Sequence, residues 1–227
     1  MRIEILGTGG GNTPELGNSS FLVWNDDMTE AVLMDCGYMT YPRLKELENR
    51  TGRKRDVIKA IKTVAISHLH SDHAGSLGAL IAHCRYLIKT KIRVAGVDLS
   101  EYLKLTDSRA SECVTGIDGR IKAIPTTHDL MPSCALYFDG LLYSGDSDKP
   151  LLALPEAKEA KVIIHEGRMD DIPSHTNIED LAKSATAEIR AKTWIIHFST
   201  NMAEAISARA KRLGFAGVCC QGQIIEV

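Results

Sequence analysis

The string HLHSDH, which begins at His68, constrains this chain more than any other feature. The apolar residues 64–66 just before it predict a buried strand, and a glycine and a helical pattern follow it. Residues two apart in an extended strand project to the same side, so His68 and His70 can bind one ion. Asp72 and His73 lie where the chain bends into the helix and are directed to a second position. The string therefore favours two adjacent metal ions over one.

The donor atoms of this string narrow the choice of metal. A carboxylate among imidazoles favours borderline ions such as zinc, or manganese or iron, over a soft-metal thiolate site. The alternative is a polar strand-to-helix loop in which a serine or aspartate caps the helix. So many ligating groups at a strand end are costly without a metal, and we prefer the metal interpretation.

Further apolar segments along the chain also end in side chains that can bind metal. These side chains are His128, Asp146 and His197. Each alone is more often an ordinary polar residue at a strand end. Strand ends at one edge of a sandwich converge, however, so these residues and the HLHSDH string can share a cleft.

Other polar groups near predicted strand ends have two interpretations each. Asp35 closes the strand AVLM, where it either caps the next turn or orients a ligand histidine. Glu166 follows the strand at 162–164 and either forms a salt bridge or assists catalysis. His175 precedes a predicted helix at 178–189 and is either a loop residue or a proton donor. The role of His165 stays open.

The order of predicted elements indicates the fold. Antiparallel strands come first, at 2–6, 21–24 and 31–35, and strand–helix alternation follows, with helices at 41–48, 75–87, 178–189 and 203–213. This order predicts an α/β fold, a four-layer αββα sandwich, in a single domain over 1–227. A hydrophobic content of 44% and a charged content of 25% are ordinary for a globular chain.

A glycine-rich segment, GTGGGNTPELG at Gly7 to Gly17, follows the first strand. A dinucleotide-binding interpretation fails, because the GxGxxG spacing and its helix are absent and no P-loop lysine follows. The alternative is a loop whose amides rim a site and contact an anionic substrate.

Charge and cysteine usage set the expected environment. The net charge of −2 gives no global attraction to nucleic acid, and the six cysteines form no CxxC pair. No apolar run is long enough to cross a bilayer, and the start lacks an apolar secretory core. We therefore expect reduced cysteines and a cytoplasmic protein without a membrane partner.

The motifs together resemble those of the metallo-β-lactamase superfamily of dinuclear hydrolases, whose signature is HxHxDH. The resemblance implies that one metal binds His68, His70 and His128, that the other binds Asp72, His73 and His197, and that Asp146 bridges them. Within the superfamily the chain looks most like ribonuclease Z, through the segments HEGR, SHTNIEDL and IIHFS. This likeness implies that His175, supported by Glu166, protonates the leaving group, and that Asp72 orients the nucleophile.

The chain departs from ribonuclease Z in two ways. It carries His175-Thr176-Asn177 where that family has HST, and it lacks the long basic, glycine-rich arm that grips transfer RNA. It is similar in design to small relatives without the arm, including anti-Pycsar and cyclic-nucleotide phosphodiesterases.

The resemblance predicts a phosphodiesterase with two divalent ions, Zn²⁺ before Mn²⁺ or Fe²⁺, and a metal-bridging hydroxide. A small diester such as a cyclic nucleotide is the favoured substrate, because the phosphate contacts that dominate nucleic-acid affinity are reduced. Alternatives are a ribonuclease Z-type processing enzyme that cuts RNA, a lactonase or thioester hydrolase, and a metal-stabilised binding protein. The resemblance also implies a homodimer.

Overall fold

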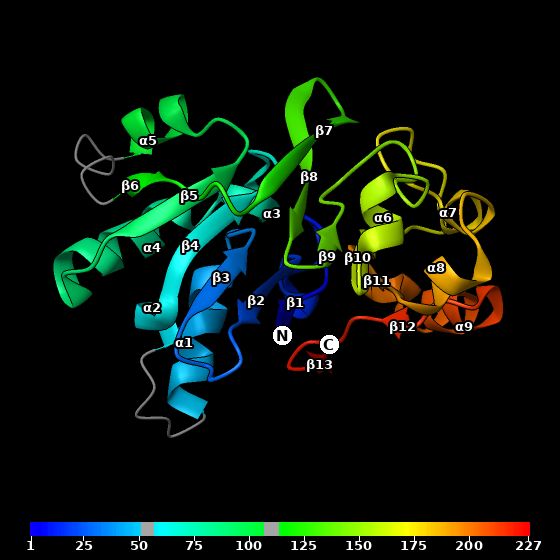
Figure 1. Cartoon of the computed structure of the whole chain (residues 1–227), viewed down its shortest axis with the longest axis horizontal. Helices are drawn as coiled ribbons and strands as arrows, with labels where there is room; N and C mark the ends of the chain where they lie inside the picture. The colour runs from blue at the N-terminus through cyan, green and yellow to red at the C-terminus, as the bar shows by residue number, and fades with distance from the viewer. Residues whose placement is uncertain (51–56, 107–113) are drawn as a thin grey trace.

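Two β-sheets pack face to face, with helices on their outer faces (Figure 1). The structure is a computed structural model and describes residues 1–50, 57–106 and 114–227. The first sheet has the order β13-β1-β2-β3-β4-β5-β6, and the second has the order β12-β11-β10-β9-β8-β7. The α/β sandwich predicted from the sequence is confirmed.

The first sheet is antiparallel from β13 to β3 and parallel from β3 to β6. Its strands are β1 (Arg2–Gly7), β2 (Ser20–Trp24), β3 (Ala31–Met34), β4 (Ile61–Ile66), β5 (Ile92–Gly96), β6 (Val114–Ile117) and β13 (Ile224–Glu226). The second sheet is antiparallel from β7 to β9 and parallel from β9 to β12. Its strands are β7 (Lys122–His128), β8 (Met131–Phe138), β9 (Leu141–Tyr143), β10 (Val162–Glu166), β11 (Thr193–Ile196) and β12 (Gly217–Val218).

Three hydrophobic clusters fill the three spaces between the four layers. Side chains alternate across a strand, so β3 sends Leu33 to the helices and Met34 to the opposite sheet. In the same way β10 sends Ile163 to its own helices and Ile164 between the sheets. Because both faces of each sheet are covered, the central strands are apolar on both sides, which explains runs such as TVAI and KVII.

The helices predicted at 41–48 and 203–213 are present, whereas those predicted at 75–87 and 178–189 are interrupted. The helices in the described part of the chain are α1 (Thr40–Arg50), α2 (Val57–Ala60), α3 (Ser71–Ala74), α4 (Leu77–His83), α5 (Ser100–Thr106), α6 (Pro155–Glu159), α7 (Ile178–Lys183), α8 (Ala187–Ala191) and α9 (Ala203–Leu213). The helix predicted at 75–87 ends its regular part at His83 and continues as a π-helical turn over Cys84–Ile88. The helix predicted at 178–189 is two helices, because Thr186 caps a new one by accepting a hydrogen bond from the Ile189 amide.

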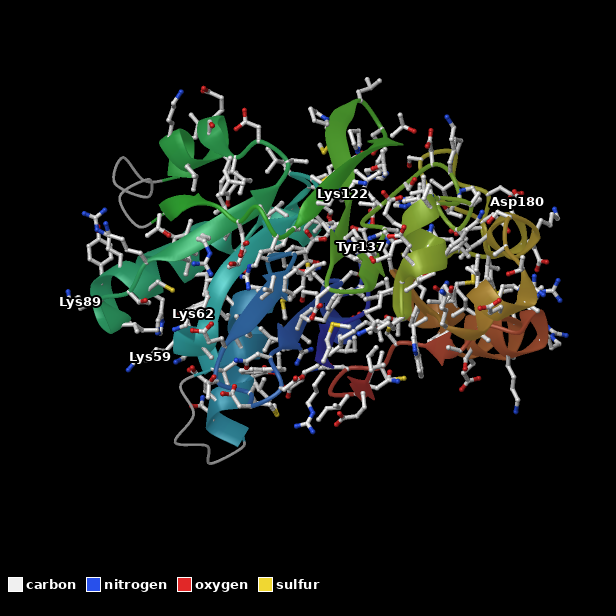
Figure 2. The ribbon with its side chains drawn as sticks, viewed as in Figure 1. Lys59, Lys62, Lys89, Lys122, Tyr137 and Asp180 are labelled. Carbon is white, nitrogen blue, oxygen red and sulfur yellow. The ribbon has the colours of Figure 1, made fainter. Side chains whose placement is uncertain are left out.

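Charged side chains lie mainly at the surface. Lys59, Lys89 and Asp180, for example, are exposed and point away from the layers (Figure 2). The cysteines that the structure describes are free thiols, whereas Cys113 lies outside the described residues. In the described part of the chain, no helix combines the length and apolarity needed to cross a membrane.

Candidate metal centre

The seven predicted ligands lie together at one rim of the sandwich. His68 follows β4, His128 ends β7, Asp146 follows β9 and His197 follows β11, so four strands of both sheets deliver a side chain to the same place. The remaining ligands, His70, Asp72 and His73, lie at the start of α3 and within it. The rim surrounds a pocket of about 280 Å³.

The first group consists of three imidazoles. Nδ1 of His70 lies 3.0 Å from Nε2 of His68 and 3.1 Å from Nε2 of His128. Nitrogen ligands of a tetrahedral zinc ion are about 3.3 Å apart, given zinc–nitrogen bonds of about 2.0 Å. These three nitrogen atoms therefore fit a single ion.

The second group mixes imidazoles and carboxylates. Nε2 of His197 lies 3.3 Å from Oδ2 of Asp72 and 3.2 Å from Oδ2 of Asp146. Nε2 of His73 lies 3.5 Å from Oδ2 of Asp72 and 3.4 Å from Oδ1 of Asp146. These spacings fit a second ion with two nitrogen and two oxygen ligands.

Asp146 lies between the two groups. Besides its contacts with the second group, its Oδ2 atom lies 3.7 Å from Nε2 of His128 and 3.9 Å from Nε2 of His68. One carboxylate thus faces ligand atoms of both groups, which is the arrangement that a bridging ligand needs.

Two ligand atoms are buried without a hydrogen-bond partner in the described structure. They are Nε2 of His73 and Oδ1 of Asp146. A buried polar atom that lacks a partner costs about 1–3 kcal/mol. Ion binding would satisfy both atoms, so the residues present fit a metal.

Asp35 contacts His73, a member of the second group, through the ring nitrogen that does not face the other ligand atoms. Its completely buried carboxylate accepts hydrogen bonds from the Ser67 amide and hydroxyl, at 2.7 and 2.8 Å, and from the Tyr143 hydroxyl at 2.8 Å. Nδ1 of His73 lies 2.7 Å from Oδ2 of Asp35. Of the two interpretations of Asp35, the structure favours contact with a ligand histidine.

The pKa shifts at the rim differ between the proposed ligands. Burial, with the neighbouring His73, lowers the pKa of His68 to about 2, so its imidazole is neutral at physiological pH. Burial would raise the pKa of Asp146, but His197 and His73 outweigh it and hold the pKa well below the usual range. Burial would lower the pKa of His73, but Asp146 and Asp35 outweigh it and raise the pKa well above its usual value. Neutral imidazole and ionised carboxylate are the forms that bind metal, so ion binding would release the His73 proton.

Glu166 and His175 lie next to the second group. Glu166 is fully buried at the end of β10, and it accepts hydrogen bonds from the amides of Ser147 and Thr176. Its Oε2 atom lies 2.7 Å from Nδ1 of His175, whose side chain lines the pocket. Burial and the nearby Asp146 raise the pKa of Glu166 well above its usual value, and burial lowers the pKa of His175. The pair can therefore share one proton beside the ligand groups.

His165 is turned away from the rim. Its Nδ1 atom lies 2.7 Å from the Glu166 carbonyl oxygen, and its Nε2 atom accepts a hydrogen bond from the Leu151 amide. Burial lowers its pKa to about 4, so it is a neutral core residue. The role of His165, which the sequence did not indicate, is therefore structural.

The glycine-rich loop forms one wall of the pocket, through Gly10, Gly11, Asn12 and Thr13. A Cβ atom on Gly10 would lie 3.0 Å from Cε1 of His197. The loop thus packs directly on a predicted ligand, and only a residue without a side chain fits there without displacing it. This location agrees with a loop that rims a site rather than one that binds a dinucleotide.

Sequence reasoning missed two charged residues that line the pocket, Asp129 and Arg168. Arg168 donates from Nε and Nη2 to the carboxylate of Asp170, at 2.8 and 2.9 Å. Asp129 directly follows His128, and Arg168 lies two residues after Glu166, which are the only sequence features that point to a place in the pocket. Isolated charged residues near strand ends are too common to be identified as functional from such positions.

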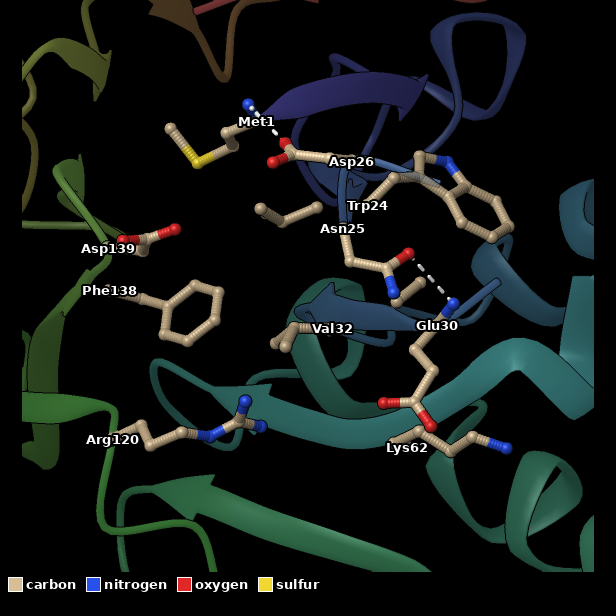
Figure 3. A pocket seen from close by; sticks show the side chains of 12 residues that line it. Met1, Trp24, Asn25, Asp26, Glu30, Val32, Lys62, Arg120, Phe138 and Asp139 are labelled. Atoms are coloured by element: carbon tan, nitrogen blue, oxygen red, sulfur yellow. Dashed lines mark hydrogen bonds and ion pairs between the residues drawn. The ribbon is translucent and has the colours of Figure 1, made fainter. Parts of the chain in front are cut away.

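A second hollow, of about 210 Å³, lies between the β2–β3 turn and the β8–β9 turn (Figure 3). The Arg120 guanidinium lies over the Phe138 ring there, 5.5 Å from its centroid. The residues that line this hollow include none of the predicted ligands or catalytic groups.

Known proteins resemble this chain over nearly all of its length. The Apyc1 anti-Pycsar protein of Paenibacillus sp. (strain J14) is 24% identical over 234 residues, covering 89% of this chain and 91% of its own. The metallo-β-lactamase fold protein YhfI from Bacillus subtilis has a TM-score of 0.79 at 19% identity, with 100% and 99% of the two chains covered. The short form of human tRNase Z has a TM-score of 0.69 at 18% identity, again over 100% and 99%.

These two structures share the fold, and the fold predicted from HxHxDH is therefore confirmed. The family model described as "Anti-Pycsar protein Apyc1" matches residues 1–97 and 95–225. The chain belongs to the Apyc1 anti-Pycsar protein family of the metallo-β-lactamase fold.

Proposed function

We propose that this chain, a metal-dependent hydrolase by its family and its site, cleaves a small phosphodiester and that a cyclic nucleotide is its substrate. The observation that carries the proposal is the Glu166–His175 pair, which lies at the pocket beside two adjacent groups of ligand atoms. A thiolate leaves without a proton, so a positioned proton donor favours a substrate with an alkoxide leaving group, such as a phosphodiester, over a thioester.

The proposed metal content is two divalent ions, Zn²⁺ before Mn²⁺ or Fe²⁺. One ion would be held by His68, His70 and His128. The other would be held by Asp72, His73 and His197, and Asp146 would bind both ions. When bound, such ions lower the pKa of water and offset the negative charge of the phosphate.

The protein groups then have separate tasks. A water-derived hydroxide attacks phosphorus opposite the departing oxygen, a new P–O bond forms, and the old one breaks. Asp72, with a partly exposed carboxylate in the pocket, accepts a hydrogen bond from the nucleophile and orients it. His175 gives a proton to the departing alkoxide from Nε2, because Glu166 occupies Nδ1.

Arg168 supplies positive charge to the substrate. Among the residues that line the pocket in the described part of the chain, it is the one lysine or arginine. Asp170 occupies Nε and Nη2, so the Nη1 edge can donate to a phosphate oxygen. A guanidinium fixed in this way suits an anion held in a pocket of 280 Å³.

A side-by-side assay tests the proposal. The zinc-loaded protein is given a set of 3′,5′-cyclic nucleotides, bis-p-nitrophenyl phosphate, a precursor transfer RNA, a lactone and a thioester. We expect cleavage of a cyclic nucleotide and of the model diester, loss of both with a chelator, and recovery when zinc is restored. Preferential cleavage of the RNA would contradict the proposed substrate. Hydrolysis of a lactone or thioester alone would contradict the proposed reaction, phosphodiester hydrolysis.

A matched pair of histidine variants identifies the site. His128→Ala removes a proposed ligand, whereas His83→Ala removes a histidine whose Nδ1 lies 2.8 Å from the Tyr41 hydroxyl, away from the rim. We expect His128→Ala to lose activity and one bound ion and His83→Ala to keep both. We also propose that the chain forms a single domain. We propose in addition that it forms a homodimer, and light scattering of the purified chain would test this.

A further inference from the structure

A histidine that binds metal through one ring nitrogen needs a partner for the other, because that partner fixes the tautomer and the orientation of the ring. Three of the five proposed ligand histidines have one within hydrogen-bonding distance. The pairs are His68 with Ser67, His73 with Asp35, and His128 with the Ser174 carbonyl. His197 faces a carboxylate, Glu166, at 3.7 Å. His70 is the remaining one.

The orientation of His70 is set by its neighbours. Its Nδ1 atom is the one that lies near Nε2 of His68 and Nε2 of His128, so Nδ1 faces the ion position. Ligation through Nδ1 leaves the ring proton on Nε2. That atom lies 3.7 Å from Oδ2 of Asp129.

Asp129 is presented by the turn between β7 and β8. It follows His128 directly and has a left-handed backbone, with φ +48°, a conformation in which aspartate and asparagine are enriched. Its side chain is 50% exposed, and that of His70 is 33% exposed. A half-exposed carboxylate on a turn has room to shorten a 3.7 Å separation to a hydrogen bond.

Asp129 is poorly placed to be a ligand itself. Its Oδ2 atom is 3.6 Å from Nε2 of His128, but the group of ligand atoms within 4.8 Å of one another contains the three histidines without Asp129. We propose that Asp129 is a positioning residue that accepts a hydrogen bond from the Nε2–H group of His70 and thereby holds Nδ1 toward the first ion. This inference rests on the proposed metal centre and is independent of the substrate.

Zinc affinity tests the inference without any use of activity. Asp129→Asn removes the charge and suits the left-handed backbone, and the full-length chain is titrated with Zn²⁺ against a chromophoric chelator. Removal of such a supporting partner weakens metal binding by 10- to 100-fold. Because this pair is partly exposed, we expect about a tenfold loss for one ion and less than a twofold change for the other.

Asp139→Asn is the matched control. Asp139 lies in the next turn of the same sheet, between β8 and β9, has φ +51°, and is exposed away from the rim. We expect this variant to bind both ions like the wild type. Wild-type affinity in Asp129→Asn would overturn the inference, as would equal losses in both variants.

A double-mutant cycle shows whether Asp129 acts through His70. In a His70→Ala background, Asp129→Asn should change zinc affinity by less than twofold, because the group that it positions is gone. A tenfold loss that persists there would overturn the inference. If the wild-type chain bound no zinc at all, the metal centre itself would be wrong, a result distinct from wild-type affinity in Asp129→Asn.

Discussion

The Nδ1 atom of His175 lies 2.7 Å from Oε2 of Glu166, a carboxylate that is completely buried. The contact joins a loop residue to the end of β10, so the strand fixes the position of a ring that faces the pocket. Burial lowers the pKa of His175 and raises that of Glu166, which keeps the imidazole from holding its proton tightly. A proton donor of this kind is useful only if the leaving group needs one.

His175→Ala should therefore depend on the leaving group. On a cyclic nucleotide, whose alkoxide needs a proton, we expect kcat to fall by about 10²–10⁴. On bis-p-nitrophenyl phosphate, whose phenolate leaves unaided, we expect a fall of about tenfold or less. Steady-state kinetics with equal zinc occupancy measure both. Equal activity of the variant and the wild type on the cyclic nucleotide would contradict a proton-donor role.

Arg168→Ala should weaken substrate binding without removing the metals. A hydrogen bond to a charged group is worth about 1.5–3 kcal/mol, so we expect kcat/KM to fall by about 10- to 100-fold, mainly through KM. The control is Arg209→Ala, because Arg209 also donates two hydrogen bonds to one carboxylate, that of Glu179, but outside the pocket. An unchanged KM in Arg168→Ala would contradict the substrate contact.

Gly10→Ala and Gly11→Ala should differ, although the two positions are adjacent. A Cβ on Gly10 would lie 3.0 Å from the His197 ring, whereas a Cβ on Gly11 would meet the Asp72 carboxylate at an ordinary 3.5 Å. Small displacements of catalytic groups are costly, so we expect about a tenfold loss of kcat/KM for Gly10→Ala and less than twofold for Gly11→Ala. Equal effects would show that the loop adapts.

Asp118 should make the unfolding free energy of the chain decrease at acidic pH. Hydrogen bonds from Arg120 lower its pKa, and Thr63 also donates to its buried carboxylate. A pKa that folding lowers contributes stability above the unfolded value of about 3.9, and this contribution is lost as the pH falls through the folded pKa. We expect Asp118→Asn to lower the unfolding free energy at pH 7 by about 1–3 kcal/mol.

The difference between Asp118→Asn and the wild type should shrink toward pH 2. Urea unfolding of the metal-free proteins at several pH values measures it. Asp180→Asn is the control, since Asp180 is exposed and pairs with Lys183 at the surface, and we expect no measurable change there. A difference that does not vary with pH would refute the assignment to Asp118.

Strand ends were predictable from the sequence because apolar runs stop sharply at polar groups. His68, Asp146 and His197 lie at most three residues after such a run, whereas His128 ends the largely exposed strand β7, and the structure gathers all four at one rim. Helix ends were less predictable. At the break between α7 and α8, Thr186 accepts from the Ile189 amide and Arg190 donates to the Ala182 and Ala185 carbonyl oxygens, contacts that an amphipathic pattern does not contain.

Contacts between segments that are distant in the chain could not be predicted from the sequence. Asp35 and Tyr143 are 108 positions apart, and their hydrogen bond depends on the packing of two sheets. Asp129 depends equally on a turn conformation that places its carboxylate beside His70. Residue type and spacing identify ligands, but the groups that hold those ligands in place emerge only when the chain is folded.

Each proposed ion position draws its donors from both sheets, with one part before residue 74 and the other after residue 127. Neither half of the polypeptide carries a working centre alone, and a shift of one sheet against the other by a single residue would separate the donors. Both proposed ion positions therefore form only when the two sheets are packed together, so metal affinity depends on the completed fold.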